Sequence, residues 1–271
     1  MKTIKGRVTV ITGAGSGIGQ ALALELASRS ARLALSDVDE QGLANTKALI
    51  NTESPNCEVR CYPLDVSCRT SVFSHAEDVK RDFGTVDWLF NNAGVALYAS
   101  VENMTLDEFD WVLSINLFGV VYGTKAFLPL MLAQGEGHII NISSILGLFA
   151  TPASSAYSTA KFAVRGFTET LARELEGTGV YASCVHPGGI KTNIGAAGKM
   201  GSKAGAYEKQ CIDNAVRHLK TEPRDLAIEI IKGVQRKKRR IIVGDSAKLA
   251  DVIARLLPAS YGKVFHAVRG L

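Results

Sequence analysis

Tyr157 and Lys161 stand four residues apart in a segment of helical periodicity. On a helix this spacing places both side chains on one face, so the lysine ammonium can approach the tyrosine phenol. A free tyrosine has a pKa of about 10, and a nearby cation favours the phenolate. The pair could therefore act as a general acid/base, although many helix surfaces carry the same spacing and do no chemistry.

A cluster of glycines lies near the N-terminus, in the run Thr12-Gly13-Ala14-Gly15-Ser16-Gly17-Ile18-Gly19. It follows an apolar segment typical of a strand and opens a segment of helical period. In this context residues without a Cβ let the backbone approach a pyrophosphate, and the free N–H groups at the helix start receive its charge. A glycine-rich turn without a ligand is the alternative. The cofactor contacts that we expect from this run are Gly13, Ser16, Gly17, Ile18 and Gly19.

Asp37 ends the second apolar segment, 18 residues after Gly19. A carboxylate in this place can hydrogen-bond a ribose 2′-hydroxyl and repel a 2′-phosphate. Neither Ser16 nor Val38, the neighbours best placed to meet a phosphate, is basic. We therefore expect NAD rather than NADP, with a solvated loop aspartate as the alternative.

Short apolar runs alternate with segments of helical period along most of the chain, which predicts a parallel sheet covered by helices on both faces. The expected strands are residues 8–12, 33–36, 58–64, 87–90, 138–142, 180–185 and 241–244. The expected helices are residues 18–28, 39–53, 67–83, 106–133, 157–176, 223–238 and a short one ending at Pro258. We predict one Rossmann-type, doubly wound α/β domain over residues 1–244, with a mobile substrate lid at about 189–222 and a C-terminal amphipathic extension at 245–271.

Further motifs surround the tyrosine and lysine in the order and spacing of a known family. They are TGAGSGIG at residues 12–19, Asn91-Asn92-Ala93-Gly94, Asn116, Ser143-Ser144, Tyr157 with Lys161, and Pro187-Gly188. Together they resemble the classical short-chain dehydrogenase/reductase family over residues 5 to about 195, and more loosely over 223–244. Chance could supply one of these motifs but not the whole set.

Carried over residue by residue, the resemblance implies roles for particular side chains. Tyr157 would be the general acid/base, Lys161 its pKa-lowering partner and a ribose ligand, and Ser144 the donor that orients the substrate oxygen. Asn116 would hold a proton-relay water. The remaining cofactor contacts implied are Asp65, Val66, Asn92, Ala93, Gly94, Pro187, Gly188, Ile190 and Thr192.

The reaction implied is hydride transfer between nicotinamide and a secondary alcohol or ketone, with Tyr157 exchanging the hydroxyl proton. The segments expected to line the substrate cavity hold almost no charge, which favours an apolar substrate that contacts Ser144, Leu146 and Tyr157. Their apolar side chains, Val95, Leu97, Ile145, Leu146, Leu148 and Phe149, could equally pack into the protein core. An NADP(H)-dependent ketoacyl-thioester or carbonyl reductase is the rival enzyme, and a dinucleotide-sensing scaffold is the rival without catalysis.

The positive charge of the chain is concentrated near its C-terminus. There are 31 Lys and Arg against 26 Asp and Glu, but the last 71 residues hold 15 basic and 7 acidic groups, including the run Arg236–Arg240. Aromatic residues make up 7% of the chain and do not interleave with this run, so we expect no nucleic-acid partner. The resemblance implies a homodimer or homotetramer.

The five cysteines have irregular spacing, which fits the reduced thiols of a cytoplasmic protein. His138, His186 and His218 have no ligand-spaced partners, so we expect no metal. The C-terminal helix could lie weakly on an anionic membrane, cover the substrate mouth or dock on a neighbouring subunit, and packing on its own protein is the simplest alternative. Its apolar face is expected to hold Leu249, Val252, Ile253, Leu256 and Leu257.

Overall fold

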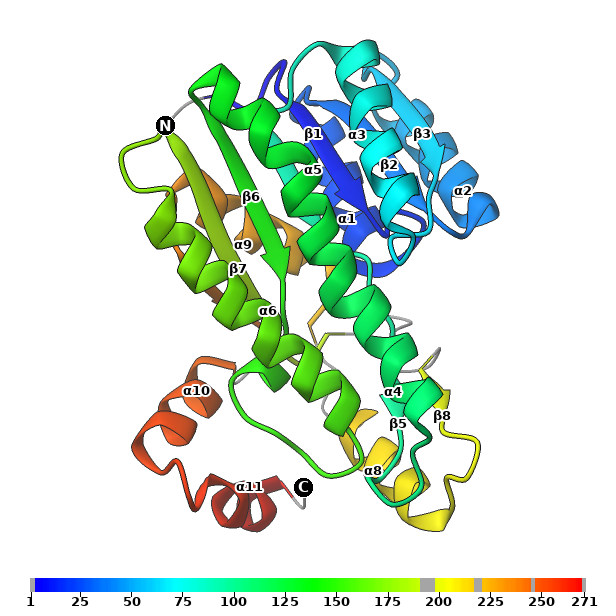
Figure 1. Cartoon of the computed structure of the whole chain (residues 1–271), viewed down its shortest axis with the longest axis vertical. Helices are drawn as coiled ribbons and strands as arrows, with labels where there is room; N and C mark the ends of the chain where they lie inside the picture. Colours follow the sequence, from blue (N-terminus) through cyan, green and yellow to red (C-terminus); the bar gives the residue numbers. More distant parts are fainter. Residues whose placement is uncertain (1–2, 191–197, 217–220, 245–246, 270–271) are drawn as a thin grey trace.

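Seven parallel strands form the central sheet of the computed structural model, which describes residues 3–190, 198–216, 221–244 and 247–269. The strand order is β3-β2-β1-β4-β6-β7-β9 (Figure 1). The strands are β1 (Val8–Thr12), β2 (Arg32–Asp37), β3 (Val59–Pro63), β4 (Trp88–Asn91), β6 (Gly137–Ile142), β7 (Val180–Pro187) and β9 (Arg240–Val243). The predicted Rossmann-type α/β fold is confirmed, and each predicted strand lies within two residues of its observed bounds.

Helices cover both faces of the sheet (Figure 1). One face carries α1 (Gly17–Ala27), α2 (Glu40–Glu53) and α9 (Pro223–Gln235), and the other carries α3 (Arg69–Phe83), α5 (Gly119–Gln134) and α6 (Ser155–Glu174). Every residue of β1 is buried because both of its faces meet such helices. Leu22 of α1 and Ile230 of α9 belong to the core of one face, and Phe127 of α5 and Leu171 of α6 to the core of the other.

The strand order reverses between β1 and β4, which sit side by side although β2 and β3 come between them in the chain. In open α/β sheets the crevice beyond the carboxyl ends of the strands at such a reversal is where ligands bind. The glycine run follows β1 and the Asn92-Ala93-Gly94 turn follows β4. The topology therefore brings two of the predicted motifs to the same crevice.

The helix expected at residues 106–133 is continuous but not uniform. It consists of α4 (Leu106–Leu113), a π-helical turn at Ser114–Phe118 and α5. The run Leu106–Gln134 is long and apolar enough to cross a bilayer by length and composition. Its α4 part packs against α6, and its α5 part packs against α3, β4 and β6, so it also fits the role of a helix covering the sheet.

Part of the predicted lid is ordered against the body of the protein. A two-stranded sheet pairs β5 (Leu97–Tyr98) with β8 (Lys199–Met200), and α8 (Ala206–Val216) follows. The remaining lid residues, 191–197 and 217–220, lie outside the described residues. The first of these ranges contains the predicted cofactor contact Thr192. The mobility expected of this lid stays a prediction.

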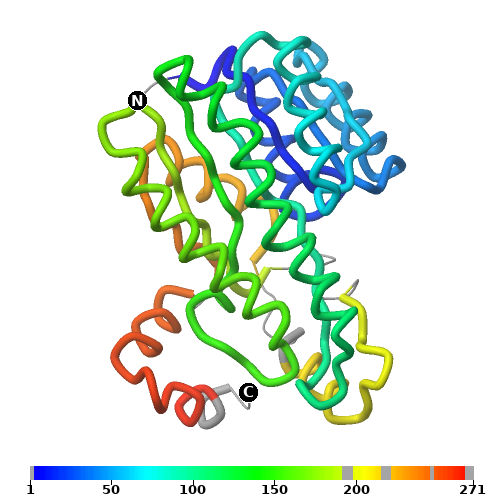
Figure 2. Tube along the Cα trace, in the orientation of Figure 1, coloured from blue at the N-terminus to red at the C-terminus, as the bar shows by residue number. Residues whose placement is uncertain are grey.

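The C-terminal extension forms two helices, α10 (Ala247–Leu256) and α11 (Tyr261–Arg269), and the sequence predicted only the first. Figure 2 shows this segment beside the loop after β6, far from it in the chain. Tyr261 and Phe265 of α11 pack on Phe149, with ring centroids 6.1 and 4.7 Å from that of Phe149. These long-range contacts, which no local pattern reveals, hold α11.

The prediction that the leucine-rich face of α10 is its buried face is wrong. Its buried residues are Ala247, Ala250, Asp251 and Ala254, whereas Leu249, Val252, Leu256 and the following Leu257 are exposed. Only Ile253 of the predicted apolar face packs against the core cluster beneath the helix. Small alanines let the helix approach the protein closely, and the leucines then point outward.

Candidate functional site

The glycine turn after β1 is fixed by the turn after β4. Gly13 has a φ of +68°, and a Cβ built on it would stand 2.7 Å from the Cα of Ala93. The Asn92 side chain donates to the carbonyls of Thr12 and Gly13 at 2.9 and 3.1 Å. The Thr12 hydroxyl accepts the N–H groups of Asn92 and Ala93 at 3.0 and 3.1 Å. A side chain at Gly19 would collide with the Gly13 carbonyl, so α1 can begin against this turn only with glycine there.

Asp37 at the end of β2 faces the same turn. Its carboxylate accepts the N–H of Gly15 at 2.7 Å and that of Asp39 at 3.0 Å. The adjacent Val38 is 74% exposed and brings no positive charge. A backbone-lined turn at a helix start with a carboxylate beside it fits the pyrophosphate and ribose of a dinucleotide.

Ser144, Tyr157 and Lys161 meet beyond the carboxyl end of β6. Ser144 follows that strand, and α6 carries the other two residues on one face, as their spacing predicted. The Lys161 Nζ lies 5.6 Å from the centroid of the Tyr157 ring and donates to the carbonyl of Ile142 at 2.9 Å. The Ser143 hydroxyl donates to the backbone carbonyl of Lys161 at 2.8 Å and so ties the loop to the helix.

The two titratable groups of this cluster shift in opposite directions. Burial raises the pKa of Tyr157 to about 12, and a hydrogen bond with Ser144 offsets part of that rise. Burial lowers the pKa of Lys161 to about 8. Each shift favours the uncharged form, because removal of water penalises a charge of either sign. The expected lowering of the Tyr157 pKa by Lys161 is not a leading effect here, and that role stays a prediction.

Asn116 lies in the π-helical turn and is fully buried. Its side chain accepts the N–H of Val95 and donates to the Val95 carbonyl, both at 2.8 Å. A Cβ on Gly94 would stand 3.0 Å from the Asn116 Oδ1 and 3.5 Å from the Lys161 Nζ. The Gly94 backbone therefore lies between these two predicted catalytic residues, and the structure brings all three together.

The other predicted cofactor residues occupy the same edge of the sheet. Asp65 is exposed after β3 and accepts hydrogen bonds from the backbone and hydroxyl of Ser67 at 2.9 and 2.7 Å, while Val66 is buried. Pro187 ends β7 and Gly188 follows it, and the Gly188 N–H donates to the Val243 carbonyl at 2.9 Å. The side chain of Ile190 is 7% exposed.

Three of the six apolar side chains expected along the substrate cavity pack instead within the protein. Leu97 belongs to a cluster with Val112, and Leu148 and Phe149 to a cluster with the C-terminal helices. Leu146 retains partial exposure, and its N–H donates to the Ser144 hydroxyl at 3.1 Å. Leu146 and Ile145 also pack in part against the cluster of the C-terminal helices, so the contact of Leu146 with substrate stays a prediction.

The sequence reasoning missed two further residues, of which Tyr98 lies near Tyr157 and Glu208 holds the loop that follows Tyr98. Tyr98 is close enough to Tyr157 to raise the pKa of its phenol. Glu208 of α8 is fully buried and accepts the N–H of Ser100 at 3.1 Å, the Asn103 amide at 2.9 Å and the N–H of Gly205 at 2.8 Å. Glu208 lies in a stretch without helical period or motif, so nothing local marked it.

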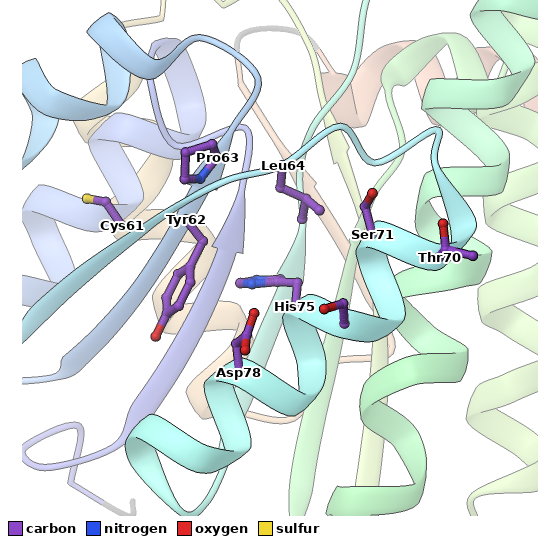
Figure 3. A pocket seen from close by; sticks show the side chains of 9 residues that line it. Cys61, Tyr62, Pro63, Leu64, Thr70, Ser71, His75 and Asp78 are labelled. Atoms are coloured by element: carbon purple, nitrogen blue, oxygen red, sulfur yellow. The ribbon is translucent and has the colours of Figure 1, made fainter.

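A cavity of about 470 Å³ lies elsewhere, between β3 and α3 (Figure 3). None of the predicted site residues lines it. Its His75 is 4% exposed and packs edge-on against the Tyr62 ring, and burial lowers its pKa to about 4. Within the described residues no group of three His, Cys, Asp or Glu side chains is placed to hold a metal ion.

Known proteins are similar to this chain over most of its length. A sequence model of the family described as short chain dehydrogenase matches residues 7–201. The candidate oxidoreductase SadH of Mycobacterium tuberculosis is 44% identical over 271 residues, which cover 98% of this chain and 96% of that protein. Levodione reductase of Leifsonia aquatica is 36% identical over 259 residues, which cover 94% of this chain and 89% of that enzyme.

Solved structures agree with the fold. A short-chain dehydrogenase/reductase from Burkholderia phymatum in complex with NAD superposes with a TM-score of 0.87 at 33% identity, covering 97% of each chain. Levodione reductase superposes with a TM-score of 0.81 at 29% identity, covering 92% of this chain and all of that one. The resemblance carried by the motifs is confirmed, and the chain belongs to the short-chain dehydrogenase family of oxidoreductases.

Proposed function

We propose that this chain transfers a hydride between NAD and an apolar secondary alcohol or ketone, with Tyr157 as the general acid/base. The observation that carries the proposal is the meeting of Tyr157, Ser144 and Lys161 beyond the carboxyl end of β6. Asn116 and the glycine turn border the same crevice. A sensing scaffold without catalysis would have no need of this complete set.

In the oxidation direction each side chain has one task. The Ser144 hydroxyl donates a hydrogen bond to the substrate oxygen and orients it, and the phenolate of Tyr157 accepts the hydroxyl proton. Bound NAD would supply the hydride acceptor, a nicotinamide ring with a positive charge, opposite the carbinol carbon of the substrate. The Lys161 ammonium donates to the Ile142 carbonyl. Its role in the proposal is to stabilise the phenolate by its positive charge and to hydrogen-bond the ribose of the cofactor.

The preference for NAD over NADP is the second part of the proposal. Support comes from the Asp37 carboxylate at the glycine turn and from the NAD found in the Burkholderia phymatum relative. A 2′-phosphate would meet this carboxylate and no cation from Ser16 or Val38. We expect wild-type kcat/KM to favour NAD and Asp37→Ala to reduce that preference by about tenfold or more, since one unfavourable charge contact is removed. A wild-type preference for NADP would favour the ketoacyl-thioester reductase alternative.

The substrate class rests on the scarcity of charge around Leu146 and on a ketone named in a relative, levodione reductase. We expect activity to rise with the apolar area of the substrate across a graded series of secondary alcohols and ketones. Turnover is measured by NADH absorbance, with Tyr157→Phe as the inactive control. Activity confined to phosphorylated or acidic substrates would contradict the proposal.

We also propose a cytoplasmic homodimer or homotetramer that assembles through the outer sides of α5 and α6. The support is exposed aromatic surface at the start of α5 and on α6, where Phe118 is 45% and Phe162 40% exposed. We expect light scattering to give the mass of an oligomer and Phe118→Ser with Phe162→Ser to reduce it. A monomeric wild type would contradict this assembly.

A further inference from the structure

The outward side of α10 is an apolar stripe. Leu249 is 62%, Val252 48% and Leu256 74% exposed, and Leu257, which follows the helix, is 42% exposed. The first three stand at i, i+3 and i+7, so they form one line along the helix opposite the buried alanines. Surface helices usually direct their polar residues outward and their apolar residues inward. On α10 the arrangement is reversed, and no described residue covers the stripe.

Cations outnumber anions beside the stripe. Lys248 and Arg255 are exposed on α10, and Lys263 is exposed on α11. The one acidic residue from 247 to 269 is Asp251, which is 7% exposed and accepts hydrogen bonds from Arg240 at 2.6 Å and Arg255 at 3.2 Å. The surface around the stripe is therefore apolar and positive.

The basic run before β9 is largely engaged within the protein. The Lys237 ammonium lies 3.8 Å from the centroid of the Tyr181 ring, and Arg239 pairs with Glu176 at 2.7 Å. Arg240 is held by Asp251, as described above. The cations beside the apolar stripe of α10 are therefore better candidates for contact with an external polyanion than this basic run.

Two occupants could cover such a stripe, and the charges discriminate between them. If two copies met through α10, Lys248 and Arg255 of one copy would approach the same cations of the other, because α10 and α11 carry no exposed acidic residue among their described residues. The exposed carboxylate of Glu229 on α9, which interacts electrostatically with Lys248, already pairs with Lys232 at 2.9 Å. An anionic lipid surface instead supplies headgroup charge to the cations and acyl chains to the leucines. We propose that α10 docks this protein on an anionic lipid surface through Leu249, Val252 and Leu256.

The docking helix is linked to the catalytic loop. Beneath α10 and α11, Ala250, Ala254 and Phe265 pack on Leu148 and Phe149, and the Tyr261 hydroxyl accepts the N–H of Ala150 at 3.2 Å. Figure 1 shows both helices at the end of the molecule where this loop lies. Docking through the stripe would place the loop after Ser144 one helix away from the lipid, on the inner side of α10.

The test is cosedimentation of the full chain with vesicles, without substrate, so that it does not depend on the proposed activity. We expect binding to phosphatidylcholine vesicles that contain phosphatidylglycerol, loss of binding in high salt, and none to phosphatidylcholine alone. Leu249→Ser with Leu256→Ser should reduce binding at least about tenfold, and Lys248→Glu at least about fivefold. Leu49→Ser, which changes a leucine 41% exposed on α2, is the matched control and should bind as wild type.

Folding and assembly are checked on the same variants. Unchanged Tm and unchanged light-scattering mass in the double variant, together with lost vesicle binding, support the proposal. Absence of binding by the wild type, or equal binding to neutral vesicles, overturns it. A fall in oligomer mass on Leu249→Ser with Leu256→Ser also overturns it, because the stripe would then be a contact between two copies of the chain.

Discussion

Burial governs both groups that would move or stabilise the proton. Burial raises the pKa of Tyr157 and lowers that of Lys161, so it disfavours the charged form of both side chains. A phenolate in this site therefore needs a positive charge close to it. The sequence predicted that these two residues, together with Ser144 and Asn116, lie in one site because the motifs have fixed spacing, and their catalytic roles stay predictions. It could not identify Tyr98 or Glu208, because the hydrogen bond from Ser100 to Glu208 spans 108 residues and depends on the folded lid.

Removal of the Tyr157 hydroxyl tests the proton chemistry directly. We expect Tyr157→Phe to lower kcat by about 10²- to 10⁴-fold, since general acid/base catalysis is lost while the ring remains. NADH binding, measured by fluorescence, should stay within about twofold of wild type. Tyr181→Phe, a change in a tyrosine 38% exposed on β7, is the control and should keep full activity. Retained turnover in Tyr157→Phe would assign the proton to another group.

At the scale of elements, local sequence patterns predicted the strands well but did not predict the π-helical turn or α11. All five residues predicted for β1 lie in that strand, because a buried parallel strand is a plain apolar run. The π-helical turn around Asn116 depends on its bonds to Val95, and α11 depends on the aromatic ring of Phe149. Contacts between distant segments create these features, so periodicity alone cannot reveal them.

The contact between the lid and the β5 loop gives a prediction about substrate affinity. Glu208 holds Ser100 and Asn103 two and five residues beyond Tyr98, and these hydrogen bonds keep the pKa of its carboxyl well below the usual range. We expect Glu208→Ala to raise the substrate KM about tenfold, since the half-buried donors of Ser100 and Asn103 lose their acceptor. The Kd of NADH should stay unchanged, because the cofactor turn is elsewhere.

Lys209→Ala is the matched control for the lid, because Lys209 is the exposed neighbour of Glu208 on the same helix. It should leave KM at the wild-type value. Partial recovery in Glu208→Gln, which retains one acceptor oxygen, would show that the hydrogen bonds matter rather than the charge. An unchanged KM in Glu208→Ala, with an unchanged Tm, would show that the lid does not position the substrate through this residue.

At the scale of the whole molecule, the predicted site and the C-terminal helices lie at the same end of the sheet. The cofactor turn, Ser144 and Tyr157 lie beyond the carboxyl ends of the strands, where the C-terminal helices also dock. The positive charge of the chain belongs to its last quarter and is partly neutralised by Glu176 and Asp251. The concentration of charge supports the proposed docking of α10, and the motifs support the proposed reaction.

Three histidines are buried, one on α3, one on β6 and one on β7, and they make the stability of the domain depend on pH. Burial lowers the pKa of His75 to about 4, of His138 to about 3 and of His186 to about 4, from an ordinary value of about 6.5. Between these values and pH 6.5 the unfolded chain binds more protons than the folded one. Stability therefore rises with pH across this window and is lost as the pH falls.

His75 gives the sharpest test, because neither ring nitrogen has a hydrogen-bond partner among the described residues. Lowering the pH from 7 to 4 should cost the wild type roughly 3 kcal/mol through this residue alone. We expect His75→Phe to retain the pH 7 urea midpoint and to lose correspondingly less stability at pH 4. Glu77→Gln, an exposed change on the same helix, should follow the wild-type curve. If His75→Phe follows it as well, the ring must already be protonated or hydrogen-bonded in the folded protein, and acid sensitivity would have to come from His138 and His186.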